Sequence, residues 1–118
     1  MSKLSYFKDR LESTISPMDF VQMQKAGKID TILLDVRNAP PQAKQVKIAG
    51  ALEIPQRALA DNLGKLAKNK LIVVYCWDVW CNLGAHACVT LLENGFDVKE
   101  LSGGIAAWRE LNLPTEQL

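Results

Sequence analysis

The sequence has little that would support a secreted, membrane-spanning or nucleic-acid-binding protein. It contains only three cysteines, and an odd number leaves at least one free thiol, which fits a reducing compartment better than a disulfide framework. The longest apolar run, Leu71 to Trp77, is far shorter than the roughly 18 residues of a membrane-spanning helix. Charged residues between Lys3 and Glu12 interrupt any apolar region of a secretory signal. We therefore expect a cytoplasmic protein without a membrane partner.

An excess of charge of one sign is also missing. Fourteen Lys and Arg residues face thirteen Asp and Glu residues, which leaves a net charge of +1. The sequence has no basic run that could follow a phosphate backbone, so nucleic acid is not an expected partner. With 118 residues, of which 48% are hydrophobic and 23% charged, the chain suits one globular domain that buries a core without disulfides or metals.

The apolar pattern predicts helices that alternate with strands. Strands are expected at residues 31–36, 51–54, 71–75 and 96–101, and helices at residues 3–12, 17–26, 84–94 and from 105 onward, with a further core-facing helix built on Leu59, Leu63 and Leu66 and a surface loop at 38–50. This alternation implies right-handed crossovers and an α/β fold, with a mainly parallel sheet of about four to five strands and helices on both faces.

The first residues are expected to form an extension to this domain. Residues 1–13 would be an N-terminal amphipathic helical extension, and residues 14–118 the domain itself. The stripe of Leu4, Phe7 and Leu11 is expected to pack on the body of the chain; the alternative is that it supports a dimer. The sequence leaves the oligomeric state open.

Cys76 lies where a parallel sheet binds its ligands, because it directly follows the strongest predicted strand, 71–75. The loop that leads on to the next helix consists of Trp77, Asp78, Val79, Trp80, Cys81, Asn82, Leu83 and Gly84. Such a turn directs backbone N–H groups and the positive end of a helix dipole to one point. We therefore expect a lowered pKa and a reactive thiolate at Cys76. The same cradle would hold a persulfide anion without a metal or an organic cofactor.

Four motifs in order give the chain a resemblance to a known family. They are Leu34-Asp35-Val36-Arg37, the segment Ile48 to Pro55, Val73-Val74-Tyr75-Cys76, and Gly95-Phe96 followed by the segment Leu101 to Trp108. Over about residues 14 to 115 the chain resembles the rhodanese family of sulfurtransferases.

The resemblance implies a rhodanese-like fold and a role for each matching residue. Cys76 would accept a sulfane sulfur from a small donor and pass it to a thiol, to a cyanide-like acceptor or to an acceptor protein. This is nucleophilic catalysis through a covalent intermediate. Asp35 and Arg37 would support the active-site region through charge-assisted hydrogen bonds, with no part in bond making.

The loop after Cys76 departs from the family pattern. It is longer than the usual rhodanese loop and contains no Arg or Lys. Asp78 would oppose thiolate formation and repel an anionic donor unless its carboxylate points away from Cys76. Lys47 and Ala49 stand where the family usually has histidine and proline.

Other functions remain open from the residues alone. Cys81 could resolve a persulfide on Cys76 or form a disulfide with it, which would make the protein a thiol redox or sensing protein. A rhodanese-like binding module without turnover is a further alternative. Phosphatase chemistry is disfavoured because the loop lacks the arginine that clamps phosphate oxygens. A zinc site is disfavoured because His86 and Cys88 point to different sides of a helix. Cys88 shares the apolar, core-facing side of that helix with Ala85, Val89 and Leu92, and His86 is expected on the surface.

The tryptophans divide into two groups. Trp77 and Trp80 flank the nucleophile, and we expect one of the two indoles to be partly exposed, where it could desolvate the sulfur or dock an acceptor. Trp108 has helical spacing with Ile105 and Leu111, which predicts a core position.

Overall fold

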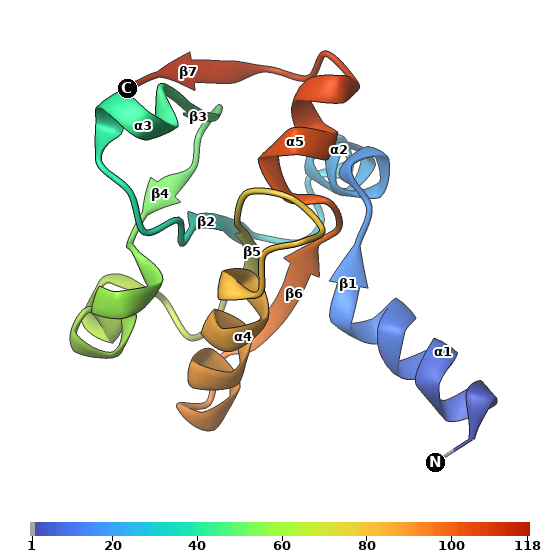
Figure 1. The fold of residues 1–118 in the computed structure, drawn as a ribbon. Coiled ribbons are helices and arrows are strands. Elements are labelled where there is room, and N and C mark those ends of the chain that lie inside the picture. The colour runs from blue at the N-terminus through green and yellow to red at the C-terminus, as the bar shows by residue number, and fades with distance from the viewer. Residues whose placement is uncertain (1) are drawn as a thin grey trace.

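The computed structural model describes residues 2–118 and shows a parallel sheet with helices on both faces (Figure 1). The five strands of the sheet are parallel and lie in the order β1-β6-β5-β2-β4. Their bounds are β1 Thr14–Ile15, β2 Thr31–Asp35, β4 Leu52–Glu53, β5 Leu71–Tyr75 and β6 Asp97–Leu101. This arrangement confirms the predicted α/β fold. The apolar runs of the sequence predict β2 and β5 because both are interior strands. Strands that are covered on both faces are rich in apolar residues.

Five α-helices and two short 3₁₀ helices connect the strands in the described residues. They are α1 Lys3–Ser13, α2 Pro17–Ala26, α3 Pro41–Lys44, α4 Leu83–Glu93, α5 Gly104–Glu110, η1 Gln56–Asp61 and η2 Leu63–Lys65. The bounds of α2 follow from its caps, since Ser16 Oγ accepts a hydrogen bond from the Asp19 N–H and Gly27 ends the helix in the left-handed conformation. Within residues 2–118, no helix is both long and apolar enough to cross a membrane.

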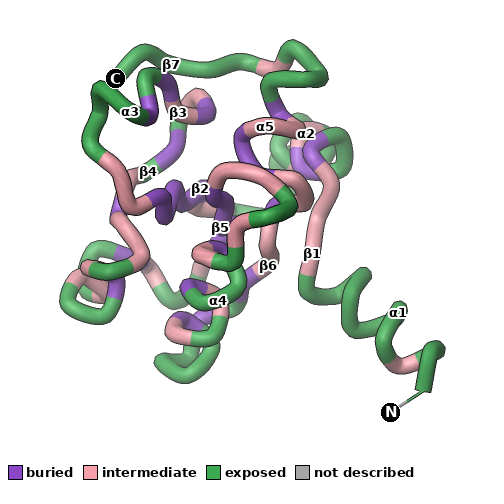
Figure 2. The backbone as a smooth tube through the Cα atoms, viewed as in Figure 1, coloured by how far each residue is buried: buried purple, intermediate pink, exposed green. Residues whose placement is uncertain are grey.

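Alternate residues of the interior strands form two cores, one on each face of the sheet. On one face, Leu34 and Val74 pack with Leu91 of α4. On the other face, neighbouring residues of the same strands pack with Phe20 of α2 and Trp108 of α5. Figure 2 shows this burial along β2 and β5. The core position predicted for Trp108 is confirmed.

Two predicted segments differ from the structure. The expected loop at 38–50 contains α3 and β3, Val46–Ile48, which pairs in antiparallel fashion with β7, Thr115–Gln117. That partner lies at the other end of the chain, so no local pattern indicated it. The helix expected on Leu59, Leu63 and Leu66 is instead the pair η1 and η2, because the chain leaves helical geometry at Asn62. Leu59 and Leu66 are nevertheless buried.

The buried face of α4 is also different from the predicted one. We expected Ala85, Cys88, Val89 and Leu92 to face the core, whereas Gly84, Ala87 and Leu91 are the buried residues. Val89 and Leu92 are exposed, and Cys88 is half-buried against the core. Small and apolar residues occur on most sides of this helix, so its sequence does not define a single face. His86 is exposed, as predicted.

The predicted packing of the apolar stripe on α1 is wrong. Leu4, Phe7 and Leu11 are exposed, and no residue of α1 is buried. The helix extends from the edge of the sheet next to β1 (Figures 1 and 2). Its C-terminal end is held by Lys99 of β6, whose Nζ donates hydrogen bonds to the carbonyl oxygens of Leu11 and Glu12.

Candidate active site

Cys76 lies directly after β5 and is 4% exposed. The start of α5 holds this point from the other side, because the backbone N–H groups of Ile105 and Ala106 donate to the carbonyl oxygens of Cys76 and Trp77 at 3.0 Å. Gly104 makes the approach possible: its φ is +59°, and a Cβ atom there would collide with the Cys76 carbonyl. Gly104 thus allows the start of α5 to hold the residues at which the Cys76 loop begins.

The Cys76 thiol has backbone donors but a raised pKa. The backbone N–H groups of Gly84 and Trp77 act to lower this pKa and so favour the thiolate. Burial and the neighbouring Cys81 thiol act in the opposite direction and raise the pKa of Cys76 to about 11. The predicted lowering of the pKa is therefore wrong, because desolvation of the buried sulfur outweighs the donors. In the thiol form, Sγ donates a hydrogen bond to the Cys81 carbonyl oxygen at 3.4 Å.

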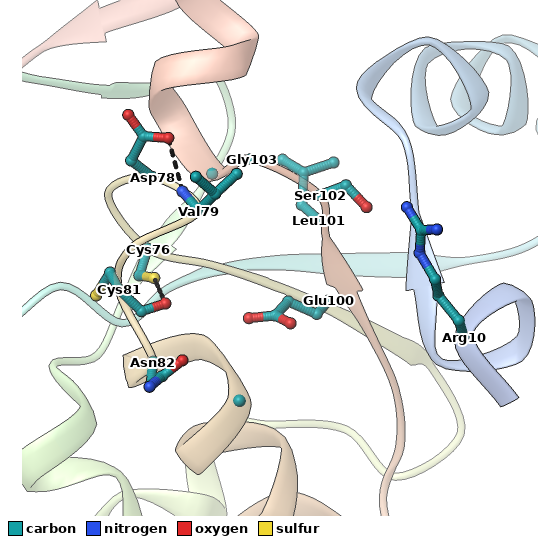
Figure 3. A pocket seen from close by; sticks show the side chains of 12 residues that line it. Arg10, Cys76, Asp78, Val79, Cys81, Asn82, Glu100, Leu101, Ser102 and Gly103 are labelled. Atoms are coloured by element: carbon teal, nitrogen blue, oxygen red, sulfur yellow. Dashed lines mark hydrogen bonds between the residues drawn. The ribbon is translucent and has the colours of Figure 1, made fainter. Parts of the chain in front are cut away.

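Asp78 is turned away from the sulfur. Its Oδ1 accepts a hydrogen bond from the Val79 N–H at 2.6 Å, and its carbonyl oxygen accepts one from the Cys81 N–H at 3.1 Å. In Figure 3 the carboxylate of Asp78 points away from Cys76. The carboxylate of Asp78 thus stabilises the turn of its own loop. Because it points away from Cys76 (Figure 3), it is not placed to oppose formation of the Cys76 thiolate.

The two indoles of the loop have different surroundings. Trp80 is 70% exposed, and Val79 beside it is 82% exposed. Trp77 is half-buried and lies against the guanidinium of Arg37, with 4.7 Å between the Arg37 Cζ and the ring centroid. The expectation that one indole is partly exposed is confirmed.

Asp35 and Arg37 form a buried ion pair beneath the loop. Arg37 Nη2 lies 2.7 Å from Asp35 Oδ2, and Arg37 is only 1% exposed. The same nitrogen donates to the Val46 carbonyl oxygen at 2.7 Å. Charge-assisted hydrogen bonds of this bidentate kind set geometry as well as energy. The pair joins the end of β2 to β3 and, through the stacked indole, to the Cys76 loop.

Tyr75 completes this network from β5. Its hydroxyl donates to Asp35 Oδ2 at 2.8 Å and accepts a hydrogen bond from the Ile48 N–H at 3.0 Å. Burial and the Asp35 charge raise the pKa of Tyr75, so the phenol stays protonated as a donor. The buried carboxylate of Asp35 therefore has partners on both sides.

Cys76 opens into a pocket of about 260 Å³ (Figure 3). The lining residues predicted from sequence are Cys76, Asp78, Val79, Cys81 and Asn82. The remaining predicted residues lie outside it: Leu83 packs against the core, Gly84 is buried in α4, and Trp77, Trp80, Asp35 and Arg37 do not line the pocket. Within residues 2–118, no group of three or more His, Cys, Asp and Glu side chains is placed to hold a metal ion.

Sequence reasoning missed two charged residues of the pocket, Arg10 of α1 and Glu100 of β6. Glu100 could have been found, because it lies near the carboxyl end of β6, which pairs with β5. No signal pointed to Arg10, since nothing local indicates that an N-terminal helix ends beside this pocket.

One protein family and several known proteins are similar to this chain. The rhodanese-like domain family matches residues 16–111. A sulfurtransferase of Allochromatium vinosum is 33% identical over 89 residues, which are 72% of this chain and 78% of that protein. The HTH-type transcriptional regulator Rv0324 of Mycobacterium tuberculosis is 33% identical over 107 residues, which are 90% of this chain. This chain matches only 46% of the length of that regulator.

Solved structures extend the similarity to the N-terminal helix. The crystal structure of a full-length protein from Lactobacillus plantarum is 34% identical, with a TM-score of 0.91, and the match covers 98% of this chain and 97% of that one. The chain therefore belongs to the rhodanese-like domain family. Arg10, however, lies outside the residues that the family description matches.

Proposed function

We propose that the protein is a sulfurtransferase that carries sulfane sulfur as a persulfide on Cys76 and passes it to a thiol or cyanide-like acceptor. The observation that carries this proposal is the position of Cys76 in a pocket at the end of an interior strand. The backbone N–H groups of Trp77 and Gly84, which favour its thiolate, support it. The similarity to a sulfurtransferase supports it. The expected partners are a small sulfur donor and a thiol acceptor, which can be a protein; no cofactor is required. Three free cysteines favour a reducing compartment such as the cytoplasm.

The reaction consists of two displacements at sulfur. The Cys76 thiolate first attacks the sulfane sulfur of the donor, and the donor's leaving group departs with the electron pair of the broken bond. The acceptor nucleophile then attacks the outer sulfur of the Cys76 persulfide, and Cys76 leaves as a thiolate. The covalent intermediate divides one transfer into two easier steps. The N–H groups of Trp77 and Gly84 would stabilise the persulfide anion between these steps.

Intact mass measurement tests the proposal. The reduced protein is incubated with thiosulfate or with a low-molecular-weight persulfide, and then with cyanide. We expect the mass to increase by one sulfur atom on Cys76, and cyanide to remove that atom as thiocyanate. A protein that gains no sulfur from either donor contradicts the proposal.

The pair of Cys76 and Cys81 favours a second candidate, a thiol redox or sensing function. Both cysteines are free and line the pocket, and the Cys76 thiol contacts the Cys81 carbonyl oxygen. Cys81 as a thiolate could attack the inner sulfur of a Cys76 persulfide, which would release hydrosulfide and leave a disulfide. One relative is a transcriptional regulator, which is consistent with a sensing role for such a domain.

Replacement of Cys81 by serine separates the two functions. Because the Cys81 thiol raises the pKa of Cys76, Cys81→Ser is expected to lower that pKa. Alkylation of Cys76 by iodoacetamide at pH 7 to 8 should become faster, since the thiolate is the reacting species. If Cys81 also resolves the persulfide, the sulfur-loaded protein should persist longer than in the wild type, as followed by mass over time. An unchanged persulfide lifetime rules out the resolving role.

A further inference from the structure

The pocket beside Cys76 is lined by one cationic and two anionic side chains, and none of the three has an ion-pair partner within residues 2–118. Among the described residues that line it, Arg10 is the single cation, and it comes from the last turn of α1. Glu100 comes from β6, and Asp78 is turned toward its own loop. No salt bridge within residues 2–118 joins Arg10 or Glu100 to any other side chain.

Glu100 is placed to receive a cationic group from a ligand. Its side chain is half-buried, and a Cβ atom on Gly84 would collide with its carboxylate, so it lies against the start of α4. Burial raises the pKa of Glu100, which means that its charged form lacks compensation in the free protein. A ligand ammonium would supply that compensation. A donor with only negative charge, such as thiosulfate, would be repelled by the same carboxylate.

The Cys76 thiol, the Glu100 carboxylate and the Arg10 guanidinium lie one after another along the pocket. In Figure 3, the carboxylate of Glu100 points toward the Cys76 loop, and Arg10 lies beyond Glu100 on the side away from Cys76. In a ligand whose sulfur contacts Cys76, the part next to the sulfur would therefore lie at Glu100, and the part farthest from the sulfur would approach Arg10. The volume of about 260 Å³ is below the range of about 300–1,000 Å³ that drug-sized ligands occupy, and suits a small molecule.

We propose that the sulfur donor is the hydropersulfide of a small amino-acid thiol, with its ammonium group on Glu100 and its carboxylate on Arg10. This inference rests on the proposed sulfurtransferase function and names the substrate class of that site. Arg10 thereby supplies the positive charge that the loop after Cys76 lacks, and it does so from a helix outside the matched family domain. Both residues determine specificity; neither takes part in bond making.

The transfer step balances with such a donor. The Cys76 thiolate attacks the outer sulfur of R–S–SH and forms the Cys76–S–SH persulfide. The S–S bond of the donor breaks, and R–S⁻ leaves with its electron pair and takes up a proton from solvent. No oxidant or reductant is consumed, because one sulfur–sulfur bond is exchanged for another.

A set of matched donors tests the charge recognition. The probes are cysteine persulfide, cysteamine persulfide, which lacks the carboxylate, 3-mercaptopropionate persulfide, which lacks the ammonium, and thiosulfate. The rate constant of Cys76 loading is measured by quenched intact mass at low ionic strength. We expect cysteine persulfide to load about tenfold faster than either truncated persulfide, as charge-assisted hydrogen bonds imply.

Two variants assign these preferences to residues. Arg10→Gln should remove the advantage of cysteine persulfide over cysteamine persulfide and leave the ammonium preference intact, and Arg10→Lys should restore part of the advantage. Glu100→Gln should remove the advantage over 3-mercaptopropionate persulfide and should speed loading by thiosulfate. Lys8→Gln and Glu110→Gln change the same charges outside the pocket and should behave as the wild type. Arg10 is exposed, so its variant tests the inference even if Glu100→Gln folds poorly.

The outcomes separate this inference from the proposed function. If no donor adds sulfur to Cys76, the sulfurtransferase function itself fails. If thiosulfate loads as fast as cysteine persulfide, or if the variants change all four donors equally, the amino-acid persulfide is not the preferred donor, and the sulfurtransferase function stands.

Discussion

Cys76→Ser is expected to abolish the gain of sulfur while the protein remains folded. A serine hydroxyl is a far weaker nucleophile toward sulfane sulfur than a thiolate and cannot form a persulfide. The fold should persist because the hydroxyl can donate to the Cys81 carbonyl oxygen that the thiol now contacts. We expect a change of about 1 kcal/mol in the free energy of unfolding, as for a single hydrogen bond. Intact mass after incubation with donor measures loading, and urea unfolding measures stability.

Cys88→Ser is the matched control for this substitution. Cys88 undergoes the same chemical change but does not line the pocket, and burial raises its pKa to about 12. This variant should load sulfur as the wild type does. If the Cys76→Ser protein still gained a cyanide-labile sulfur, the nucleophile would have to be another cysteine.

Asp35→Ala is expected to cause the largest loss of stability. The substitution leaves the guanidinium of Arg37 buried without its counter-ion, and it removes the acceptor of the Tyr75 hydroxyl. Breaking a buried pair in this way costs about 3–5 kcal/mol, a large part of the roughly 5–15 kcal/mol that stabilises a domain. Urea unfolding should show a lower midpoint, and the fluorescence of Trp77 should change because Arg37 stacks on its ring.

Asp30→Ala provides the comparison for Asp35. Asp30 pairs with Lys70 at 3.5 Å, but its side chain is 72% exposed, so we expect a loss of at most about 1 kcal/mol. Tyr75→Phe should fall between the two, since it removes one hydroxyl of the network and keeps the ion pair. Equal effects of Asp35→Ala and Asp30→Ala would mean that the buried pair does not support the fold under the Cys76 loop.

The elements that the sequence predicted correctly share a physical cause. The segments that became β2 and β5 are short apolar runs, and α2 carries its own caps at Ser16 and Gly27, so each element is specified by nearby residues. The incorrect predictions concern elements with distant or ambiguous partners. β3 exists through its pairing with β7, and the buried face of α4 depends on how the helix packs.

The same distinction between local and distant causes applies to the candidate active site. The location of Cys76 could be predicted because parallel strands bind ligands at their carboxyl ends, and because four motifs resemble one family. The protonation of Cys76 could not be predicted: local N–H donors favour the thiolate, but burial among residues from several elements raises the pKa. Only the tertiary structure shows which of these opposing effects is larger.

By itself, the sequence determined the α/β fold, the family and the cysteine at the end of β5, because these depend on residue patterns within short segments. The tertiary structure decided what surrounds that cysteine. Arg10 and Glu100 lie far from Cys76 in sequence, and they line one pocket only because β6 pairs with β5 and α1 leads into β1 beside β6. The charge of the pocket, and with it the donor we propose, is a property of this assembly, since electrostatic interactions depend on distance in space and on burial.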